Sequence, residues 1–454
     1  MISSGNSLSF AYLGLNSADQ DGSSTYLTFI FKVNIWFLEI ENPVLINYHF
    51  THFTVKRRKF IQQAGVITGL AGIGPIHAFS NDLLSTKKVR IGIIGGRFGA
   101  SFYFHEQPNC IVEAVSDLRE DRRNHLMKTY NCKKSYGSLE ELLKDPKIDA
   151  VFLATPAPDH ARHTIASLQA GKHVLCAVPL GMSIEECQEI KETVLKTGKN
   201  FMMAETSVYM QGTISARKFY EEGRFGEIFS AAAEYNHPGL EVLWFEDGKP
   251  TWRHGLAPMN YPTHCTALLV SVTGERLKKV SCLGYGKGDG LLKDNPYNNP
   301  FWNETAFFQT DQDHPFRVEV NWKGALRNAE RGEWRGEKMS FYLPTGHSNA
   351  STIVTNASEM GKDDAGFEHT NNKVEPYEVT KWWQTDMLPE PLRHNSGHDG
   401  SHTFITHEFI QSIVEERMPK VNIYEALAYT VPGIVAHQSS LKGGELLTIP
   451  DFDD

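Results

Sequence analysis

Side chains that can bind oxygen atoms and exchange protons gather in the stretch NYPTH (260–264), which precedes the apolar run CTALLVSVTG. The run predicts a helix that begins after a proline-containing turn, so Asn260, Tyr261 and His264 should cluster at its N-terminus. The positive end of a helix dipole favours bound oxygens, and a histidine there can pass a proton near neutral pH. A helix start whose histidine is only hydrogen-bonded to its surroundings is the alternative.

Residues suited to a sugar ring occur elsewhere in the chain. Trp252 and Arg253 are neighbours, Trp302 lies in an asparagine-rich loop, and His398 stands beside a glycine-rich turn. Aromatic rings with planar amide and guanidinium donors match the faces and hydroxyl groups of a sugar. Packing at a domain rim explains the two tryptophans equally well, so both interpretations stay open.

The C-terminal histidines do not predict a metal centre. His398, His402 and His407 lack the His-Glu-x-x-His spacing, and no cysteine lies among them. The six cysteines of the chain contain no Cys-x-x-Cys pair, so we expect free structural thiols and no bound metal.

A glycine-rich turn follows the strand-like run VRIGIIG (89–95). Against the dinucleotide fingerprint G-x-G-x-x-G/A, Gly95 supplies the first glycine, Arg97 replaces the second, and Ala100 is an allowed third residue. The guanidinium of Arg97 can instead contact phosphate. The turn predicts a cofactor-binding site formed by Gly95, Gly96, Arg97, Phe98 and Gly99.

Asp117 closes the second predicted strand, 22 residues after Gly95, where a carboxylate accepts hydrogen bonds from the adenosine ribose. A carboxylate there repels a 2′-phosphate, so we expect NAD rather than NADP. A domain of this fold with an unused crevice is the alternative.

The elements that must position these groups alternate between strand and helix in the first half of the chain. Apolar runs near residues 89–95, 111–117, 150–156, 173–179 and 200–206 are separated by amphipathic stretches. This alternation predicts a doubly wound parallel α/β sheet, a Rossmann domain over residues 86–208, with ligands at the carboxyl ends of its strands.

Residues 209–454 predict an α+β domain with a large, mostly antiparallel open sheet, because several runs alternate apolar and polar side chains. An uncovered sheet face favours association, and we expect a homo-oligomer. The chain has 454 residues, ordinary composition and a net charge of −9, which argues against nucleic acid as a partner.

The N-terminal segment predicts export rather than fold. In residues 55–81, Arg57 and Arg58 precede a short, weakly apolar run that ends near Ala78 and Ser80. The segment resembles a twin-arginine signal peptide, which predicts a periplasmic or otherwise exported protein that leaves the membrane after cleavage. Because a signal peptide stands at a chain start, we expect residues 1–54 to be a mis-assigned start or a disordered extension.

The segment ATPAPDHARHTIASLQAGKHVLC (154–176) resembles the glucose–fructose oxidoreductase/inositol dehydrogenase (Gfo/Idh/MocA) family, and the likeness extends from Lys88 to Asp451. The resemblance implies a Rossmann domain followed by an α+β domain. It also implies cofactor contacts on the nicotinamide side from Thr155, Pro156, His160 and Pro179.

The family's Glu-Lys-Pro motif, whose lysine lies near the reacting hydroxyl, reads Ala177-Val178-Pro179 in this chain. The usual lysine-assisted dehydrogenase mechanism therefore lacks its charged group here. A base elsewhere, at Tyr209 or His264, would have to take the proton.

One branch of the family, the NAD-dependent α-N-acetylgalactosaminidases, also has Val-Pro at this point. The segments YPTH (261–264) and MAETSVY (203–209) look like those of the branch, although its glutamate before Val-Pro is Ala177 here. In that branch the sugar is oxidised at C3, which acidifies the C2 proton; elimination, hydration and re-reduction follow. The resemblance implies Tyr209 as the base, His264 as the ligand of the C3 hydroxyl and Tyr261 beside it.

These observations predict an exported, NAD-dependent oxidoreductase that transfers a hydride at a ring carbon of a sugar or glycoside and keeps its cofactor bound. A redox-neutral glycosidase is the first alternative. A non-catalytic sugar-binding protein on the same fold is the second, and the loss of the lysine at Val178 counts in its favour.

Overall fold

The computed structural model describes residues 87–327, 329–344 and 349–453, together with the backbone of three N-terminal strands. These strands form a small antiparallel sheet in the order β1 (Gly14–Ala18), β2 (Thr25–Phe29) and β3 (Thr54–Lys56). Most of the predicted signal segment (55–81) lies outside the described residues. The predictions of export and of a mis-assigned start therefore stay predictions.

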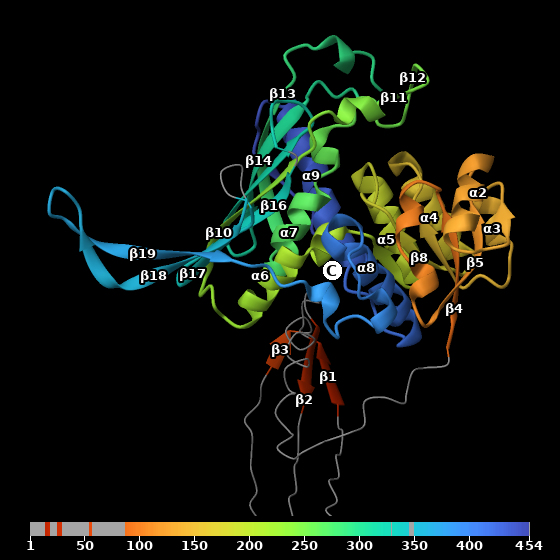
Figure 1. Ribbon diagram of the computed structural model, residues 1–454, viewed down its shortest axis with the longest axis horizontal. Helices are drawn as coiled ribbons and strands as arrows, with labels where there is room; N and C mark the ends of the chain where they lie inside the picture. The colour runs from red at the N-terminus through yellow and green to blue at the C-terminus, as the bar shows by residue number, and fades with distance from the viewer. Residues whose placement is uncertain are drawn as a thin grey trace, which may run out of the picture. The chain divides into compact units, whose positions relative to one another are not determined.

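Residues 85–454 form one compact unit that contains two large sheets. The first is parallel throughout and has the strand order β6-β5-β4-β7-β8-β9 (Figure 1, orange to yellow). Its described strands are β4 (Val89–Ile94), β5 (Cys110–Ser116), β6 (Ser135–Tyr136), β7 (Ala150–Leu153), β8 (His173–Cys176) and β9 (Phe201–Met203). This arrangement confirms the predicted doubly wound sheet.

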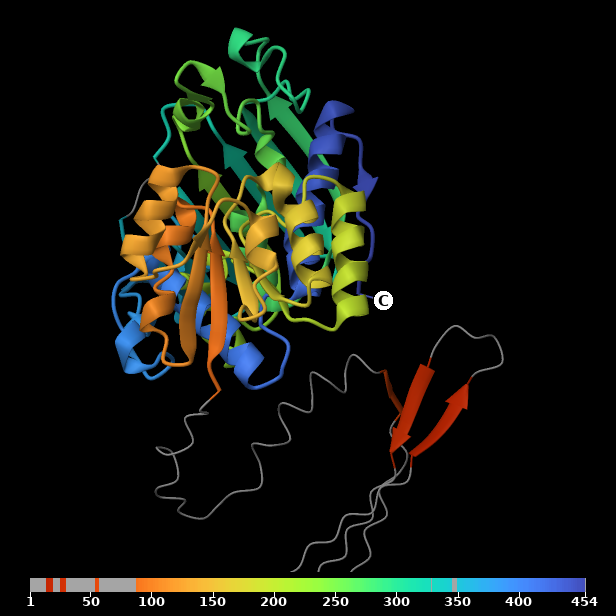
Figure 2. The same cartoon turned by 90° about the vertical axis from the view of Figure 1, so that its right-hand side faces the viewer.

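Helices flank the parallel strands (Figure 2). They are α2 (Glu120–Thr129), α3 (Leu139–Leu143), α4 (His160–Gln169) and α5 (Ile184–Thr197). The start of α5 shows how the sequence sets these boundaries: Ser183 accepts a hydrogen bond from the backbone of Glu186, whose carboxylate in turn accepts one from Met182. The Ser183 hydroxyl thus caps a backbone N–H that the first helical turn leaves unpaired, and the Glu186 carboxylate fixes the residue before the cap.

The second sheet has the described strand order β19-β18-β17-β16-β10-β15-β14-β13-β20. Only the central pair β10–β15 is parallel among its described pairings. The strands are β10 (Ile228–Asn236), β13 (Leu277–Tyr285), β14 (Asn303–Thr310), β15 (Pro315–Asn321), β16 (Ala329–Gly336), β17 (Met339–Tyr342), β18 (Ser351–Lys362), β19 (Glu368–Tyr377) and β20 (Leu447–Thr448). The predicted, mostly antiparallel sheet is confirmed.

Four helices lie between or beside the sheets: α6 (Gln211–Glu221), α7 (Thr263–Thr273), α8 (Gly397–Val414) and α9 (Ile423–Leu441). In Figure 1, α7, α8 and α9 occupy the space between the antiparallel sheet and the parallel sheet. Helix α9 contacts β13 of one sheet and β9 of the other, so it joins the two domains into one core.

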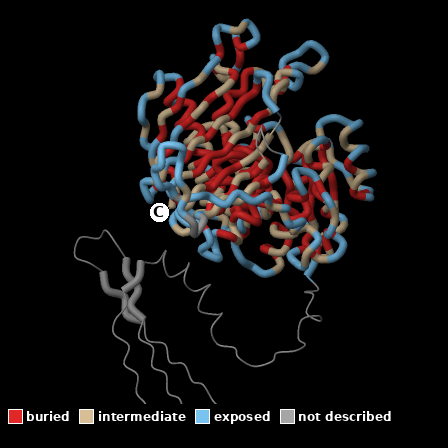
Figure 3. The backbone as a smooth tube through the Cα atoms, turned by 60° about the vertical axis from the view of Figure 1, so that its left-hand side comes forward, coloured by how far each residue is buried: buried red, intermediate tan, exposed pale blue. Residues whose placement is uncertain are grey.

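Buried residues concentrate in the strands and in the helices between them, whereas the hairpin β18–β19 is exposed along most of its length (Figure 3). Among the described residues, no helix has the length and apolar content that crossing a bilayer requires.

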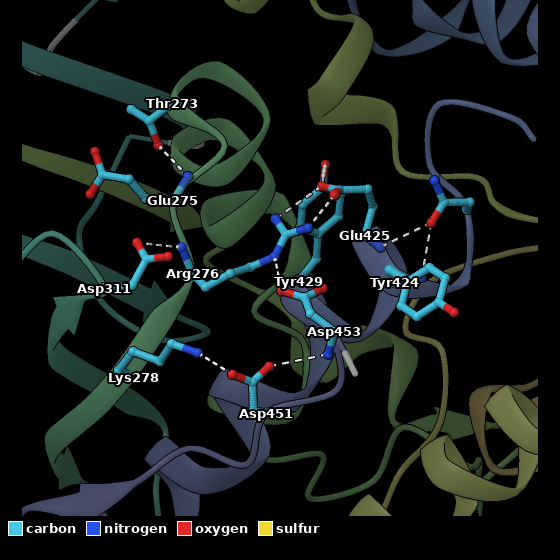
Figure 4. Close-up of polar contacts among 11 residues, drawn as sticks. Thr273, Glu275, Arg276, Lys278, Asp311, Tyr424, Glu425, Tyr429, Asp451 and Asp453 are labelled. Carbon is cyan, nitrogen blue, oxygen red and sulfur yellow. Dashed lines mark hydrogen bonds and ion pairs between the residues drawn. The ribbon is translucent and has the colours of Figure 1, made fainter. Parts of the chain in front are cut away.

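Charged side chains fix the C-terminal segment to the second domain (Figure 4). The guanidinium of Arg276 contacts Glu425 at the start of α9, and its Nε lies 3.0 Å from an Asp453 oxygen. Lys278 pairs with Asp451 nearby. Arg276 is largely buried, so its two carboxylate partners hold the chain end against β13 and α9.

Candidate active site

A cavity of about 710 Å³ lies at the carboxyl ends of the parallel strands and is closed by the second domain. Its lining includes predicted residues from both halves of the chain. These are Gly95, Gly96, Arg97, Phe98, Asp117, Thr155, Pro156, Trp252, Arg253, Tyr261, His264 and His398. The volume suits a ligand larger than a single sugar ring, and the position matches the general rule for ligands of open α/β sheets.

At Gly95 and Gly96, the glycine-rich turn presents backbone rather than side chains to the cavity. Gly95 has φ of +101°, and a Cβ there would come within 2.2 Å of the Ala154 carbonyl oxygen. A Cβ on Gly96 would lie 2.6 Å from the Cβ of Arg122. Only glycine fits both positions, so the backbone stays open to a phosphate group.

Two backbone hydrogen bonds hold the carboxylate of Asp117 just after the end of β5. Its Oδ2 accepts a hydrogen bond from the Gly96 backbone at 2.7 Å, and its Oδ1 accepts one from the Arg119 backbone at 2.9 Å. The carboxylate lines the cavity beside the glycine turn. Together the turn and Asp117 fit the adenosine diphosphate half of NAD.

Three arginines at this end of the cavity converge on one carboxylate from the second domain. Glu246, in the hairpin strand β11 (Phe245–Glu246), lies 3.0 Å from Arg97, 3.1 Å from Arg119 and 3.4 Å from Arg122. Arg97 therefore points out of the turn and into an ion-pair cluster, where it lines the cavity as predicted from the sequence.

His160 lies behind the cavity wall rather than on it. Its Nδ1 is 2.7 Å from the Pro179 carbonyl and its Nε2 is 2.9 Å from the Thr155 carbonyl. Burial opposes a charge, but the nearby Cys176 sulfur and the two carbonyls outweigh it and raise the pKa of His160 to about 9. His160 thus links the loops after β7 and β8, which carry Thr155 and Pro179.

His264 occupies the centre of a buried polar cluster at the start of α7. Its Nδ1 lies 3.0 Å from Glu205 Oε1, 3.2 Å from Ser207 Oγ and 3.6 Å from Glu330 Oε1, and Ser207 also hydrogen-bonds to Glu330. Because Nδ1 faces the carboxylates, Nε2 is the nitrogen left for a ligand in the cavity.

The charges in this cluster follow from its burial. Burial disfavours the cationic ring, but Glu205 and Glu330 outweigh it and raise the pKa of His264 to about 9. Burial also opposes ionisation of Glu205, yet His264 keeps the pKa of that carboxyl below its ordinary value. Burial raises the pKa of Glu330. At neutral pH, His264 is therefore a cation paired with the Glu205 carboxylate.

Glu205, His264 and Glu330 each offer one atom that could bind a metal ion, and these three atoms lie within 4.8 Å of one another. The direct hydrogen bonds among these groups already account for their positions. The absence of a metal stays a prediction.

Aromatic side chains form the wall next to His264. The Tyr235 ring lies 4.6 Å from the His264 ring and 5.7 Å from Trp322, and Tyr261 lies 5.4 Å from His264. Arg253 stacks over Trp252 with 4.1 Å between its guanidinium carbon and the ring centroid. These six side chains all line the cavity and give it apolar faces and hydrogen-bond donors suited to a sugar.

Six predicted residues do not line the cavity: Tyr209, Trp302, Asn260, Gly99, His160 and Pro179, of which Pro179 directly follows the lining residue Val178. Tyr209 is buried in the core and stacks on Phe404, so it cannot reach a ligand. Trp302 is buried against Trp244, with its indole nitrogen bonded to Asp289. Asn260 and Gly99 stand next to lining residues but do not themselves line the cavity.

Other lining or supporting residues were missed by the sequence analysis: Glu205, Tyr235, Glu246, Trp322 and Glu330. Tyr235 belongs to β10, Trp322 directly follows the neighbouring strand β15, and Glu330 belongs to β16. The MAET segment (203–206) was the one available signal, since it places an acid at the end of the last parallel strand.

Comparison with known families agrees with this geometry. Residues 89–205 match the Gfo/Idh/MocA model, described as an oxidoreductase family with an NAD-binding Rossmann fold, and residues 349–454 match the C-terminal domain of glycosyl hydrolase 109. The chain combines a Gfo/Idh/MocA domain with a glycosyl hydrolase 109 C-terminal domain. The predicted family and the NAD-binding domain are thereby confirmed.

Curated relatives align over most of this chain. An alpha-N-acetylgalactosaminidase of Shewanella oneidensis is 29% identical over 459 residues, which cover 88% of this chain and 96% of that protein. A glycosyl hydrolase family 109 protein of Saccharopolyspora erythraea is 23% identical, covering 86% of this chain and 90% of the relative.

Solved structures confirm the fold. Levoglucosan dehydrogenase, in complex with NADH and levoglucosan, has a TM-score of 0.65 at 18% identity and covers 80% of this chain and 100% of its own. Scyllo-inositol dehydrogenase from Lactobacillus casei, with bound NAD(H) and scyllo-inositol, has a TM-score of 0.59 at 15% identity, covering 80% and 99%.

Proposed function

We propose that this protein is a glycosidase that uses a resident NAD to cleave a glycoside without net oxidation. The observation that carries the proposal is the single cavity in which the glycine turn and Asp117 of the NAD-binding domain face His264, Tyr261 and the aromatic wall of the second domain. The glycosyl hydrolase 109 domain at the C-terminus supports cleavage over simple dehydrogenation.

A bound NAD would supply a hydride acceptor for a ring carbon and a hydride donor for the final re-reduction, and a carbonyl at that carbon would acidify the neighbouring C–H bond. The chain's own residues hold the cofactor. Gly95 and Gly96 leave room for the pyrophosphate, Asp117 accepts hydrogen bonds from the ribose, and Thr155 and Pro156 line the wall beyond them.

His264 is the group that stabilises negative charge on the sugar oxygen. Glu205 and Ser207 hold its Nδ1 side, so the cationic ring donates a hydrogen bond from Nε2 into the cavity. A donor that is already oriented and charged stabilises a developing oxyanion without reorganisation. Tyr235, Tyr261 and Trp322 exclude water from one side of this donor.

The sugar itself is held by stacking and by planar donors. Trp252 and Arg253 form a stacked pair on the wall of the cavity that the cofactor-binding glycines also line. This pairing suits a glycoside with hydroxyl or amide oxygens at its edge.

The proposal is tested with purified protein and aryl glycosides, including α-N-acetylgalactosaminides, in deuterated water. We expect cleavage, deuterium incorporation at one ring C–H and no net NADH. His264→Ala should lower turnover by about 10²- to 10⁴-fold while bound NAD remains. Steady accumulation of NADH would instead identify a net dehydrogenase, and sugar binding without turnover would identify a binding protein.

A further inference from the structure

The proposed reaction needs a base in the cavity, and the residue that would be the family's lysine is Val178. Tyr209 is buried in the core, so it does not supply that base. The imidazoles that line the cavity are those of His163, His237, His264 and His398. His264 is held as a cation by Glu205 and is therefore a donor rather than an acceptor.

His398 is presented by an unusual turn at the start of α8. Its φ of 50° lies in the left-handed region, and Asp399 and Gly400 follow with φ of 55° and 81°. Gln211 fixes this turn from α6: its backbone N–H donates to the Asp399 carboxylate at 3.0 Å, and its amide donates to the Asp399 carbonyl at 2.8 Å. Backbone strain of this kind is retained where the surrounding structure requires it.

A second imidazole sets the proton positions on His398. The Nδ1 of His402 lies 2.8 Å from the Ser101 carbonyl oxygen, which can only accept, so that nitrogen carries a hydrogen. The Nε2 of neutral His402 must then accept, and it lies 2.8 Å from the Nδ1 of His398. His398 therefore donates from Nδ1, and its Nε2 is left unprotonated.

Aromatic contacts hold the pair rigidly. The ring of His402 stacks on Phe102 with 4.3 Å between centroids, and the edge of Phe98, a cavity-lining residue, packs against both imidazoles at 6.0 and 5.6 Å. Among the imidazoles that line the cavity, His398 is the one that hydrogen-bonds to a second imidazole.

We propose that Nε2 of His398 is the base that removes the ring C–H proton next to the oxidised carbon, and that His402 is its positioning residue. The C–H bond breaks, its electron pair forms a C=C bond, and the glycosidic oxygen leaves with the C–O pair and takes a proton from water. The abstracted proton rests on His398, whose Nδ1–H still donates to His402. The inference rests on the proposed function and deepens it.

The electrostatics of the cavity agree with this assignment. Burial, followed by the positive charge of His264, lowers the pKa of His398 to about 4, so the ring is neutral at working pH. A base this weak suffices beside a carbonyl, since carboxylates with pKa values of about 4.6 perform the same step. The pKa of His264 is raised and that of His398 is lowered, so His264 serves as the hydrogen-bond donor and His398 as the base.

The test compares variants of the holoenzyme. His398→Asn keeps a residue that tolerates positive φ but removes the base. We expect it to retain bound NAD and to reduce that NAD on addition of glycoside, while deuterium exchange and cleavage fall by at least about 100-fold. His402→Leu should likewise retain NAD reduction and lose deuterium exchange and cleavage. His402→Gln, whose amide can accept from His398 and donate to Ser101, should restore part of the exchange.

His407→Leu is the matched control, because His407 belongs to the same helix, bonds to Gln107 and lies away from the cavity. It should leave exchange unchanged. Nitrogen NMR of labelled wild-type protein should show His398 protonated at Nδ1 alone. The opposite tautomer, or near wild-type exchange in His398→Asn, would overturn the inference. If wild-type protein neither reduces bound NAD nor cleaves any glycoside, the proposed function fails, and the inference falls with it.

Discussion

At the scale of single residues, the sequence predicted those site residues that belong to a short, recognisable motif. The NYPTH stretch placed Tyr261 and His264 on the cavity, and the glycine turn placed Gly95 and Gly96 there. No local motif could predict the partners of His264. Glu205 lies 59 residues before it, after the last strand of the parallel sheet, and Glu330 lies on β16 of the antiparallel sheet. The sequence also could not show which side of a short helical turn Tyr209 would face.

The state of His264 gives a prediction about pH. Glu205 and Glu330 raise its pKa to about 9, so activity that needs the cation should persist up to that pH and fall above it. Glu205→Gln removes the paired charge and should move this alkaline limb to lower pH, toward the ordinary histidine value of about 6.5. Profiles of kcat/KM against pH for wild type and variant measure the shift.

The exposed Glu337→Gln is the control and should leave the limb in place. An unchanged limb in Glu205→Gln would show that His264 is not the group that limits activity at high pH.

The glycine turn gives a second residue-scale prediction. In Gly95→Ala, the added Cβ would lie 2.2 Å from a backbone oxygen and the residue would keep a φ of +101°. The turn must therefore shift, and we expect bound NAD to be lost while the second domain remains folded. Equilibrium NAD titration checks this, with Gly171→Ala as a control at another positive-φ glycine that has open space around it. Unchanged NAD affinity would contradict the assigned cofactor site.

At the scale of elements, apolar periodicity predicted five of the six parallel strands, all but the two-residue β6, and most of the central antiparallel strands. Strand β16 was missed because its sequence, AERGEWRG, is highly charged. In the structure these charges are paired: Arg331 meets Glu234 on the neighbouring strand β10, and Arg335 meets Glu333 on β16 itself. The polar hairpin β18–β19 was missed for a similar reason, since it lacks the apolar alternation of a half-buried strand.

The C-terminal anchor tests how these elements hold together. Arg276→Met leaves the carboxylates of Glu425 and Asp453 without their shared, largely buried partner, and should cost about 3 kcal/mol of unfolding free energy. Lys278→Met removes the more exposed pair with Asp451 and should cost less than about 1 kcal/mol. Denaturant unfolding of both variants measures the difference, and equal losses would contradict the role given to Arg276.

At the scale of the whole molecule, two predictions concern its association with further copies and its export from the cell. Homo-oligomer formation stays a prediction, and the second sheet exposes Leu283, Tyr285 and Phe307 along β13 and β14. Export also stays a prediction, because it depends on residues 55–81.

Intact-mass analysis of the protein from its native host tests export directly. We expect a mature chain that begins near residue 82, because small residues precede that point and the compact unit begins at Ser85. Recovery of a chain that retains residues 1–54 would contradict both the predicted cleavage and the predicted start.

The proposed reaction depends above all on an NAD that stays bound in the cavity shared by the two domains. It is tested most directly by purifying residues 82–454 without added cofactor, denaturing the protein and quantifying released NAD and NADH. We expect about one nicotinamide cofactor per chain, held through purification and absent from Gly95→Ala. No cofactor on release, together with no binding on titration, would contradict it and would point to a sugar-binding protein instead.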